Sequence, residues 1–301
     1  MSDDNYEPYH WQVGDPADWG DSTGVPDIPY MGYLNGNDDD DNVANHTYRS
    51  TSQILHEEAW RLRKQGKYEE ALVVINRAIS HDDRHFDNWN VKAIILEDMH
   101  RYSEAIECYD EALRLNSTQT VKNNKAYSLS RLADTEKNND RALRYINEAL
   151  KLVSDDSKKY TYLHIKGNIL ERMGRRVDAR VCYLLAGGLT DEVAEIERQK
   201  TIMQNTKEPM INVTGTRHYG GNAPFSEGAI LNLIPEPTNV HDCDAIRVEV
   251  NGETVGYVAN SVYTLIEGIK SAKELKDIIK PNQKAEVMFV HAQEYVIAKL
   301  I

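Results

Sequence analysis

Apolar residues change their spacing along the chain close to residue 205. Before that point they recur at helical spacing, as Val193, Ile196 and Ile202 do. Beyond it, apolar and polar positions alternate with the period of a half-buried strand. The alternating run is Ile246, Arg247, Val248, Glu249 and Val250. The pattern therefore predicts a helical region followed by a β-rich region, which is the organisation of a multidomain α + β protein.

Three segments follow from this change of pattern. Residues 1–50 lack a periodic apolar face and are predicted to be a disordered acidic tail. Residues 51–205 form the helical domain and residues 206–301 the β domain, and the segment 206–210, which contains Pro209, is the expected hinge. Limited proteolysis is then expected to cut near Thr206 and release two fragments that each melt cooperatively.

A repeat organises the helical region. Tyr68, Ala71 and Ala78 recur 34 residues later as Tyr102, Ala105 and Ala112, and this is the period of the tetratricopeptide (TPR) helix-turn-helix. Weaker copies follow with a shift of 37 residues, at Ala142, Ile146 and Ala149 and then at Ala179, Tyr183 and Ala186. The region therefore resembles an all-α TPR solenoid of about four repeats, with residues 190–204 as its capping helix.

The first helix of each TPR pair forms the concave surface on which such solenoids usually bind peptides. The residues expected in this groove are Trp60, Asn90, Asn123, Tyr127, Arg131 and Asn168. Trp60 and Tyr127 have no evident packing role in the pattern. Asn90 and Asn123 are similar to the asparagines with which some TPR domains hold a peptide's C-terminal carboxylate, but the flanking lysines are absent. The repeat predicts an unidentified protein or peptide partner, without that clamp.

The β region contains an irregular loop followed by a hairpin. Pro235 and Pro237 each remove a backbone donor, so the segment between them and residue 245 is predicted to be a loop rich in polar side chains. Asn251-Gly252 supplies the turn of a type I′ hairpin. Counting outward from this turn pairs Val248 with Val255, Ile246 with Tyr257, and Arg247 with Gly256. Because Gly256 has no side chain, it is expected to leave room beside the loop.

These residues resemble a HIRAN domain over about residues 210–270. The motifs that carry the resemblance are Thr214-Gly215-Thr216-Arg217-His218-Tyr219-Gly220, Gly228, Glu236-Pro237, Asn239, His241-Asp242, Ala245-Ile246, Asn251-Gly252 and Gly256-Tyr257-Val258. The resemblance implies a small OB-like β-barrel with a short helix. It also implies a pocket for the 3′ end of single-stranded DNA, in which aromatic side chains stack on bases and an acidic residue contacts the terminal hydroxyl.

Residue by residue, the resemblance assigns six positions to nucleic-acid binding: Arg217, His218, Asn239, His241, Asp242 and Tyr257. It places Arg217 and Asn239 near a phosphate, His218 and His241 at the stacking positions, and Asp242 at the terminal hydroxyl. Two departures from the family pattern stand out. Family members have tyrosines at the two histidine positions, and a basic residue where this chain has Ala259 and Asn260. The alternative is that the loop's side chains only cap their own turn.

Charge limits the kind of nucleic-acid binding. The chain of 301 residues has a net charge of −13, and residues 1–50 hold eleven acidic residues against the single Arg49. Residues 206–301 hold twelve acidic and nine basic residues. Non-specific duplex binding needs many cationic contacts, so this domain is not expected to coat DNA. A pocket that captures one strand end by stacking needs few. The acidic tail is expected to act as a solubility element, a docking segment or a nucleic-acid mimic.

No catalytic motif stands out, so the chain is predicted not to be an enzyme and to need no cofactor or metal. The three cysteines are scattered and fit a reducing cytoplasm. An extended chain would turn Cys243 away from Asp242, which argues against a metal site. The prediction is a non-catalytic, cytoplasmic adaptor that binds nucleic acid and a protein. The alternatives are a pure protein-interaction scaffold and a metal-dependent hydrolase, for which Glu236 is the nearest second carboxylate to Asp242.

Overall fold

The computed structural model describes residues 49–261, 264–266 and 268–301. The predicted acidic tail therefore lies almost entirely outside the described residues. The described chain forms two compact units that divide between Lys125 and Ala126. Each unit is described by itself below.

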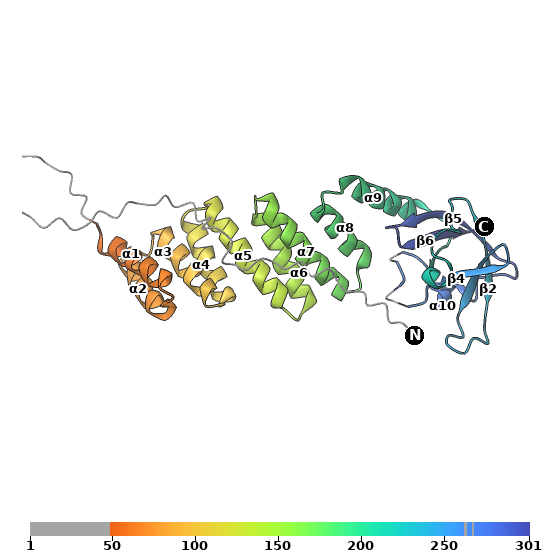
Figure 1. Ribbon diagram of the computed structural model, residues 1–301, viewed down its shortest axis with the longest axis horizontal. Coiled ribbons are helices and arrows are strands. Elements are labelled where there is room, and N and C mark those ends of the chain that lie inside the picture. Colours follow the sequence, from red (N-terminus) through yellow and green to blue (C-terminus); the bar gives the residue numbers. More distant parts are fainter. Residues whose placement is uncertain (1–48, 262–263, 267) are drawn as a thin grey trace, which may run out of the picture. The chain divides into compact units, whose positions relative to one another are not determined.

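The first unit consists of antiparallel helix pairs (Figure 1). Its helices are α1 (Thr51–Lys64), α2 (Tyr68–His81), α3 (Phe86–Asp98), α4 (Tyr102–Leu115) and the start of α5 (Gln119–Thr135). Ser50 begins α1 with a capping box that includes Gln53. The four alanines of the 34-residue repeat, Ala71, Ala78, Ala105 and Ala112, are completely buried. Small side chains at these positions let the paired helices approach closely, so the structure confirms the repeat.

The second unit continues the helix pairs before the sheet begins. Its helices are the rest of α5, α6 (Asn139–Leu152), α7 (Asp156–Arg172), α8 (Arg176–Ala186) and α9 (Thr190–Asn205). Gly167 of α7 lies against the ring of Tyr183 of α8, and a Cβ at this glycine would meet a ring carbon at 2.3 Å. A larger residue at this position would have to displace the Tyr183 ring. The bounds of α9 agree with the predicted capping helix.

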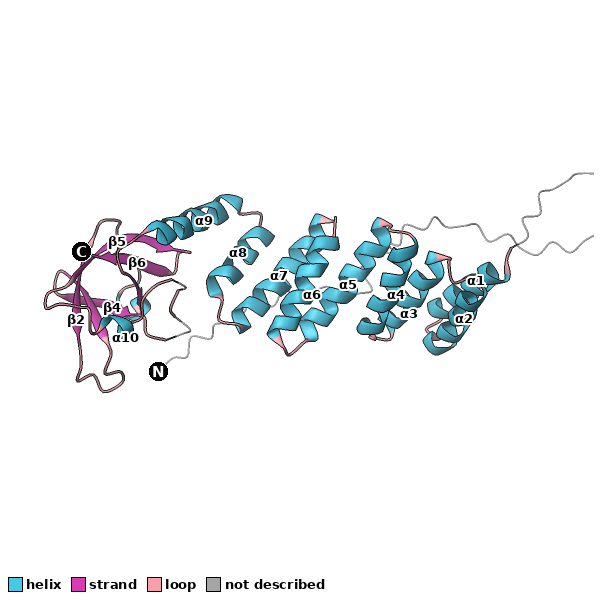
Figure 2. Cartoon of the chain, turned by 180° about the vertical axis from the view of Figure 1, so that it is seen from behind, coloured by secondary structure: helices cyan, strands magenta, loops and turns pink. Residues whose placement is uncertain are grey.

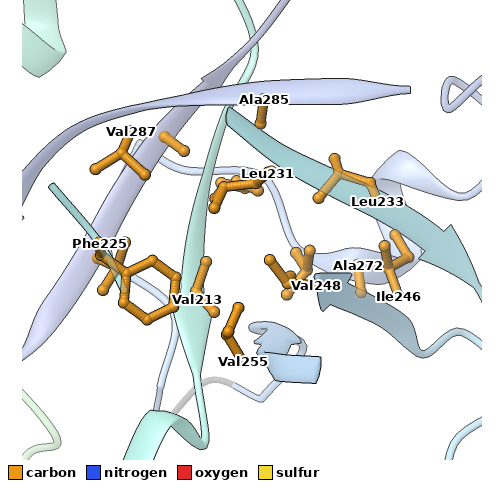
Figure 3. Packing of buried hydrophobic residues seen from close by; sticks show 14 of the residues in the cluster. Val213, Phe225, Leu231, Leu233, Ile246, Val248, Val255, Ala272, Ala285 and Val287 are labelled. Atoms are coloured by element: carbon orange, nitrogen blue, oxygen red, sulfur yellow. The ribbon is translucent and has the colours of Figure 1, made fainter. Parts of the chain in front are cut away.

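A closed six-stranded antiparallel barrel follows (Figure 2). Its strand order is β1-β4-β3-β2-β5-β6. Its elements are β1 (Met210–Thr214), the 3₁₀ helix η2 (Thr216–Tyr219), β2 (Ile230–Pro235), β3 (Ile246–Val250), β4 (Glu253–Val258), α10 (Ala272–Leu275), β5 (Lys284–His291) and β6 (Tyr295–Leu300). Figure 3 shows side chains from several strands, including Val213, Leu231 and Val248, packed inside it. The expected OB-like barrel with a short helix is confirmed.

The hairpin register differs from the predicted one. Arg247 pairs with Tyr257 and Val248 with Gly256, because a bulge next to Val248 adds one residue to β4 that simple counting omits. The space beside Gly256 is also not free. A Cβ there would lie 2.7 Å from the Thr214 carbonyl oxygen. Gly256 therefore allows β1 to approach β4, and it does not open the loop.

The helix α9 packs directly on the barrel. Met203 of α9 shares a buried cluster with Met210, Tyr295 and Ile297. A second cluster joins Ile196 of α9 and Leu184 of α8 to Ala292 of the β5–β6 turn. The domain boundary at 205/206 and the hinge at 206–210 remain predictions, and this packing bears on them because removal of α9 exposes apolar barrel surface.

We expect a barrel fragment to depend on α9. A fragment of residues 206–301 should unfold at a lower temperature and urea concentration than one of residues 190–301. The physical reason is that burial of each large apolar side chain contributes about 1.5 to 3 kcal/mol, and the shorter fragment lacks Ile196 and Met203. Circular dichroism melts of both fragments measure the difference. Equal midpoints would show that the boundary at 205/206 separates independently folding parts.

Candidate functional site

The 3₁₀ helix η2 presents three consecutive polar and aromatic side chains to solvent. Gly215 and Gly220 flank it with φ of 73° and 90°, a left-handed conformation that favours glycine. Thr216 is buried, and its hydroxyl donates to Asn222 Oδ1 at 3.1 Å. The following residues, Arg217, His218 and Tyr219, are exposed. The sequence motif therefore places two predicted site residues on one short, anchored helix.

Tyr219 and Tyr257 form an aromatic pair. Their ring centroids lie 6.3 Å apart with an interplanar angle of 50°. Tyr219 is 38% exposed, and Tyr257 on β4 is half-buried. Tyr257 is one of the predicted site residues, whereas Tyr219 was missed. The signal for Tyr219 was present in the sequence, because it belongs to the same motif as Arg217 and His218.

One carboxylate connects this pair to the loop after β2. Glu236 Oε1 accepts a hydrogen bond from Arg247 Nε at 2.6 Å, and Oε2 accepts from Asn239 Nδ2 at 2.9 Å and from the Tyr257 hydroxyl at 3.4 Å. Arg247 also pairs with Glu249. The hydrogen bond from Asn239, together with Arg247, holds the pKa of Glu236 below its ordinary value. Partial burial raises the pKa of Tyr257, and the neighbouring Glu236 adds to the effect.

The side chain of Asn239 fixes the loop's backbone. Its Oδ1 accepts from the amides of His241 and Asp242 at 3.0 and 3.3 Å, which is a side-chain cap of a turn. Asp242 is held as well. Its Oδ1 accepts from the Asp244 amide and its Oδ2 from Asn260 Nδ2, both at 2.9 Å. Asn260 belongs to the Ala259-Asn260 pair where a basic residue was expected from the family pattern, and its amide contacts the predicted end-binding carboxylate.

The predicted site residues thus fall into two groups. Asn239 and Tyr257 both contact Glu236, and Asp242 lies on the same loop. Arg217 and His218 lie on η2, which is connected to this loop through the Tyr219–Tyr257 ring pair. His241 is exposed at the loop's tip. Arg247 was missed because a strand arginine between two apolar residues gives no sign of its partner eleven residues earlier.

The loop also brings together three groups that can bind metals. Ligand atoms of Asp242, Cys243 and Asp244 all lie within 4.8 Å of one another. The expectation that Cys243 turns away from Asp242 is wrong, because the segment is a turn and not an extended chain. Lys276 Nζ contacts Asp244 at 2.7 Å and Asn260 contacts Asp242, so the two carboxylates already have polar partners. Glu236 is bound by Arg247 and is not part of this group.

The predicted groove residues of the first unit have packing and polar contacts. Trp60 packs against the buried clusters of both helix pairs, and the guanidinium carbon of Arg63 lies 5.0 Å from its ring centroid. The expectation that Trp60 has no packing role is therefore wrong. Asn90 Oδ1 accepts from Asn124 Nδ2 at 3.3 Å, and Asn123 Oδ1 accepts from Gln119 Nε2 at 2.9 Å.

The groove residues of the second unit are more accessible. Tyr127 on α5 is 40% exposed, and Arg131 on the same helix is exposed. Asn168 on α7 is exposed and accepts a hydrogen bond from the Tyr183 hydroxyl at 2.9 Å. These positions place an aromatic ring, a guanidinium and an amide at the surface.

Comparison with known families agrees with both regions. A model described as HIRAN domain matches residues 210–284, and one described as tetratricopeptide repeat matches residues 86–119. The chain carries a HIRAN domain and a tetratricopeptide repeat. The TPR match covers α3 and α4, and the HIRAN match ends as β5 begins. A HIRAN domain is associated with nucleic-acid binding, and a TPR repeat with protein interaction.

Solved structures similar to the chain are TPR proteins. The type III secretion chaperone SycD of Yersinia enterocolitica, in complex with a peptide of the translocator YopD, is 16% identical over 43% of this chain and 99% of its own, with a TM-score of 0.34. The first TPR of Spaghetti (RPAP3), bound to an HSP90 peptide, is 17% identical over 40% and 92%, with a TM-score of 0.32. A MamA structure is 16% identical over 47% and 78%, with a TM-score of 0.38.

No curated protein matches the chain. Among the helices of the described residues, none combines the length and the apolar content that spanning a membrane requires.

The Glu236 network predicts a pH-dependent contribution to stability. Because the native pKa of Glu236 is lowered, its contribution is present above the unfolded-state pKa of about 4.3 and is lost as the pH falls through the lower native value. Glu236→Gln should therefore lower the free energy of unfolding by about 1 to 2 kcal/mol at neutral pH, and this difference should shrink in acid. Urea unfolding near neutral pH and well below the ordinary glutamate pKa measures both values.

The control for this comparison is Glu253→Gln, at the exposed start of β4, which removes the same charge. A difference between wild type and Glu236→Gln that stays constant across the pH range would contradict the linkage.

Proposed function

We propose that the chain is a non-catalytic adaptor. Its HIRAN domain binds the 3′ end of single-stranded DNA, and its TPR groove binds a protein partner. The observation that carries the nucleic-acid part is the Tyr219–Tyr257 ring pair next to Arg217 on the exposed helix η2. Aromatic faces stack on bases regardless of sequence, and each stacked base contributes roughly 1 to 3 kcal/mol. The guanidinium of Arg217 is suited to contact one phosphate.

The site needs few cations for this function. Residues 206–301 carry more acidic than basic residues, which argues against binding along a duplex. Stacking on Tyr257, with Tyr219 beside it, derives its energy from ring contact instead. His218 and His241 extend the aromatic surface on η2 and on the loop. Salt dependence should accordingly be shallow.

Asp242 is proposed to recognise the terminal hydroxyl. Each of its two oxygens accepts one hydrogen bond in the structure, and a carboxylate has about four acceptor positions. The remaining capacity can accept a hydrogen bond from a 3′ hydroxyl, and the negative charge repels a 3′ phosphate. Asn239 is proposed to act mainly by holding the loop that presents His241 and Asp242, and Asn260 by orienting the carboxylate.

A second candidate is a pure protein-interaction scaffold. The observation that favours it is the hydrogen bonding of Asn239 and Asp242 within their own loop. In that case the loop is structural and the ring pair has no ligand. The two candidates differ in whether an oligonucleotide binds.

The protein-binding part rests on the exposed polar and aromatic residues of α5 and α7. Peptide complexes of SycD and of the Spaghetti TPR show what those proteins bind, and we propose a peptide or protein ligand here as well. A cytoplasmic location is also proposed, since Cys108, Cys182 and the exposed Cys243 are all unpaired thiols.

Binding of a 3′-hydroxyl oligonucleotide tests the nucleic-acid proposal. The full chain should bind a fluorescent single strand with a free 3′ hydroxyl more tightly than the 3′-phosphorylated strand or a blunt duplex, as measured by anisotropy. Tyr257→Ala should weaken binding roughly tenfold or more because it removes a stacking face. Asp242→Asn should remove the preference for the hydroxyl end while retaining an oxygen for the Asp244 amide.

Tyr160→Ala is the matched control, because Tyr160 is 45% exposed and lies on α7, away from the barrel strands. No binding by the wild-type chain, or equal binding to both end chemistries, would favour the scaffold.

Substitutions in the second unit test the protein-binding groove. Tyr127→Ala combined with Asn168→Ala should abolish recovery of proteins that copurify with the wild type and leave the helical melting transition nearly unchanged, because both side chains are exposed. Val73→Ala, at a position 62% exposed on α2, is the control. If partner recovery survives the double substitution but disappears on deletion of residues 1–48, the tail and not the groove holds the partner.

A further inference from the structure

A cavity of about 1220 Å³ lies within the second compact unit, apart from the loop and ring pair described above. Its wall comes from five segments: the α7–α8 turn, α9, the connection from α9 to β1, the described residues of the segment between β4 and α10 that includes Lys270, and the β5–β6 hairpin. Both the last TPR helices and the barrel therefore contribute residues. The volume is sufficient for a small organic ligand.

The inner wall of this cavity is largely apolar and well ordered by packing. Met203, Met210 and Tyr295 line it and are 8%, 7% and 6% exposed. They belong to the cluster that joins α9 to the barrel. A ring or another apolar body can lie against these side chains.

One buried polar atom in the wall has no partner. His291 lines the cavity and is completely buried, and its Nε2 makes no hydrogen bond with any of the described residues. Buried nitrogens without a partner are rare, because their desolvation is not compensated. Neighbouring atoms cover this nitrogen, so a ligand group in the cavity that pairs with it must displace part of that cover.

The neighbouring contacts determine which ring nitrogen of His291 carries the proton and whether the ring is charged. Gln199 Nε2 donates to Glu195 Oε1 at 2.9 Å, which turns Gln199 Oε1 toward His291 Nδ1, 2.8 Å away. Because Oε1 can only accept, Nδ1 carries the proton. Burial, with a smaller contribution from the nearby Lys200, lowers the pKa of His291 to about 4, so the ring is neutral near pH 7. Nε2 is therefore a hydrogen-bond acceptor and requires an N–H or O–H donor on the ligand.

The charged residues of the lining leave an excess of positive charge. Five Lys or Arg and three Asp or Glu line the cavity. Asp178 is paired with both Arg175 and Lys200, and Lys200 also contacts Glu197. Lys207 and Lys270 have no ion pair with any of the described residues. Among the residues that the structure describes, no carboxylate occupies these two ammonium groups, and Glu208 follows Lys207 directly in the sequence.

We propose that this cavity binds a phosphorylated small molecule of nucleotide size. Its phosphate contacts Lys207 and Lys270, its apolar or aromatic body lies against Met203 and Tyr295, and an N–H or O–H group donates to His291 Nε2. A nucleoside monophosphate has all three features. The ligand would contact both α9 and the barrel, so its binding stabilises their packing.

Calorimetric titration of the full chain tests the proposal with adenosine 5′-monophosphate, adenosine and inorganic phosphate. The monophosphate should bind, and the other two should bind at least tenfold more weakly, since each lacks one of the contacts. Lys207→Ala with Lys270→Ala should weaken binding by roughly tenfold or more. His291→Asn keeps a donor toward Gln199 and removes the acceptor, and it should weaken binding about tenfold.

Lys280→Ala with Lys284→Ala is the matched control, because it removes the same charge from barrel residues outside the cavity lining. Circular dichroism melts establish that each variant is folded. If His291→Asn does not fold, the lysine pair, which has accessible side chains, still decides the question.

Three results would overturn the proposal: no binding of the monophosphate, unchanged affinity in the Lys207/Lys270 variant, or displacement of a bound single-stranded oligonucleotide by the monophosphate. The last result would place the nucleotide in the strand-binding site instead. Failure of oligonucleotide binding alone would leave the cavity proposal intact, because the two sites share no residue.

Discussion

The candidate nucleic-acid site depends on the closure of the barrel between β1 and β4. This junction is short, with Val213 opposite Val258 and Thr214 opposite Tyr257. It is possible only because Gly256 has no side chain, since a Cβ there would overlap the backbone of β1. Closure carries the chain directly from β1 into η2 beside Tyr257. The aromatic pair is thus a consequence of how β1 and β4 pair. A side chain at Gly256 would disturb both that strand pairing and the position of η2 beside Tyr257.

The same junction shows what sequence patterns could and could not predict. Alternation of apolar residues correctly placed β3, and the 34-residue spacing placed the helix pairs, because both patterns record one buried face. The bulge after Val248 was not predictable by counting, since counting outward from the turn sets one residue of β4 opposite each residue of β3. Trp60 was misjudged for a related reason. Its packing comes from two neighbouring helix pairs, and a single repeat does not reveal that environment.

The site residues differ in how readily the sequence alone identifies them. Arg217, His218 and Asp242 belong to contiguous motifs, and the structure keeps them at the surface or on the loop. Arg247 acts through Glu236, and that contact exists only because β2, the loop and β3 fold back on one another. Its role is to orient rather than to bind. Sequence motifs identify residues that face a ligand more readily than the residues that hold them in place, because the latter are defined by tertiary contacts.

The two proposed sites would bind their ligands through different interactions. At the ring pair, Arg247 has two carboxylate partners, so this trio of side chains carries a net negative charge, and exposed aromatic surface remains for a ligand. In the cavity, two lysines have no ion pair and one buried imidazole nitrogen has no hydrogen bond with any residue that the structure describes. An unsatisfied polar group costs stability that good packing does not recover. A protein that keeps His291 completely buried next to Gln199 therefore keeps a destabilising atom at the contact between α9 and the barrel, and a donor group of a bound ligand would remove that cost.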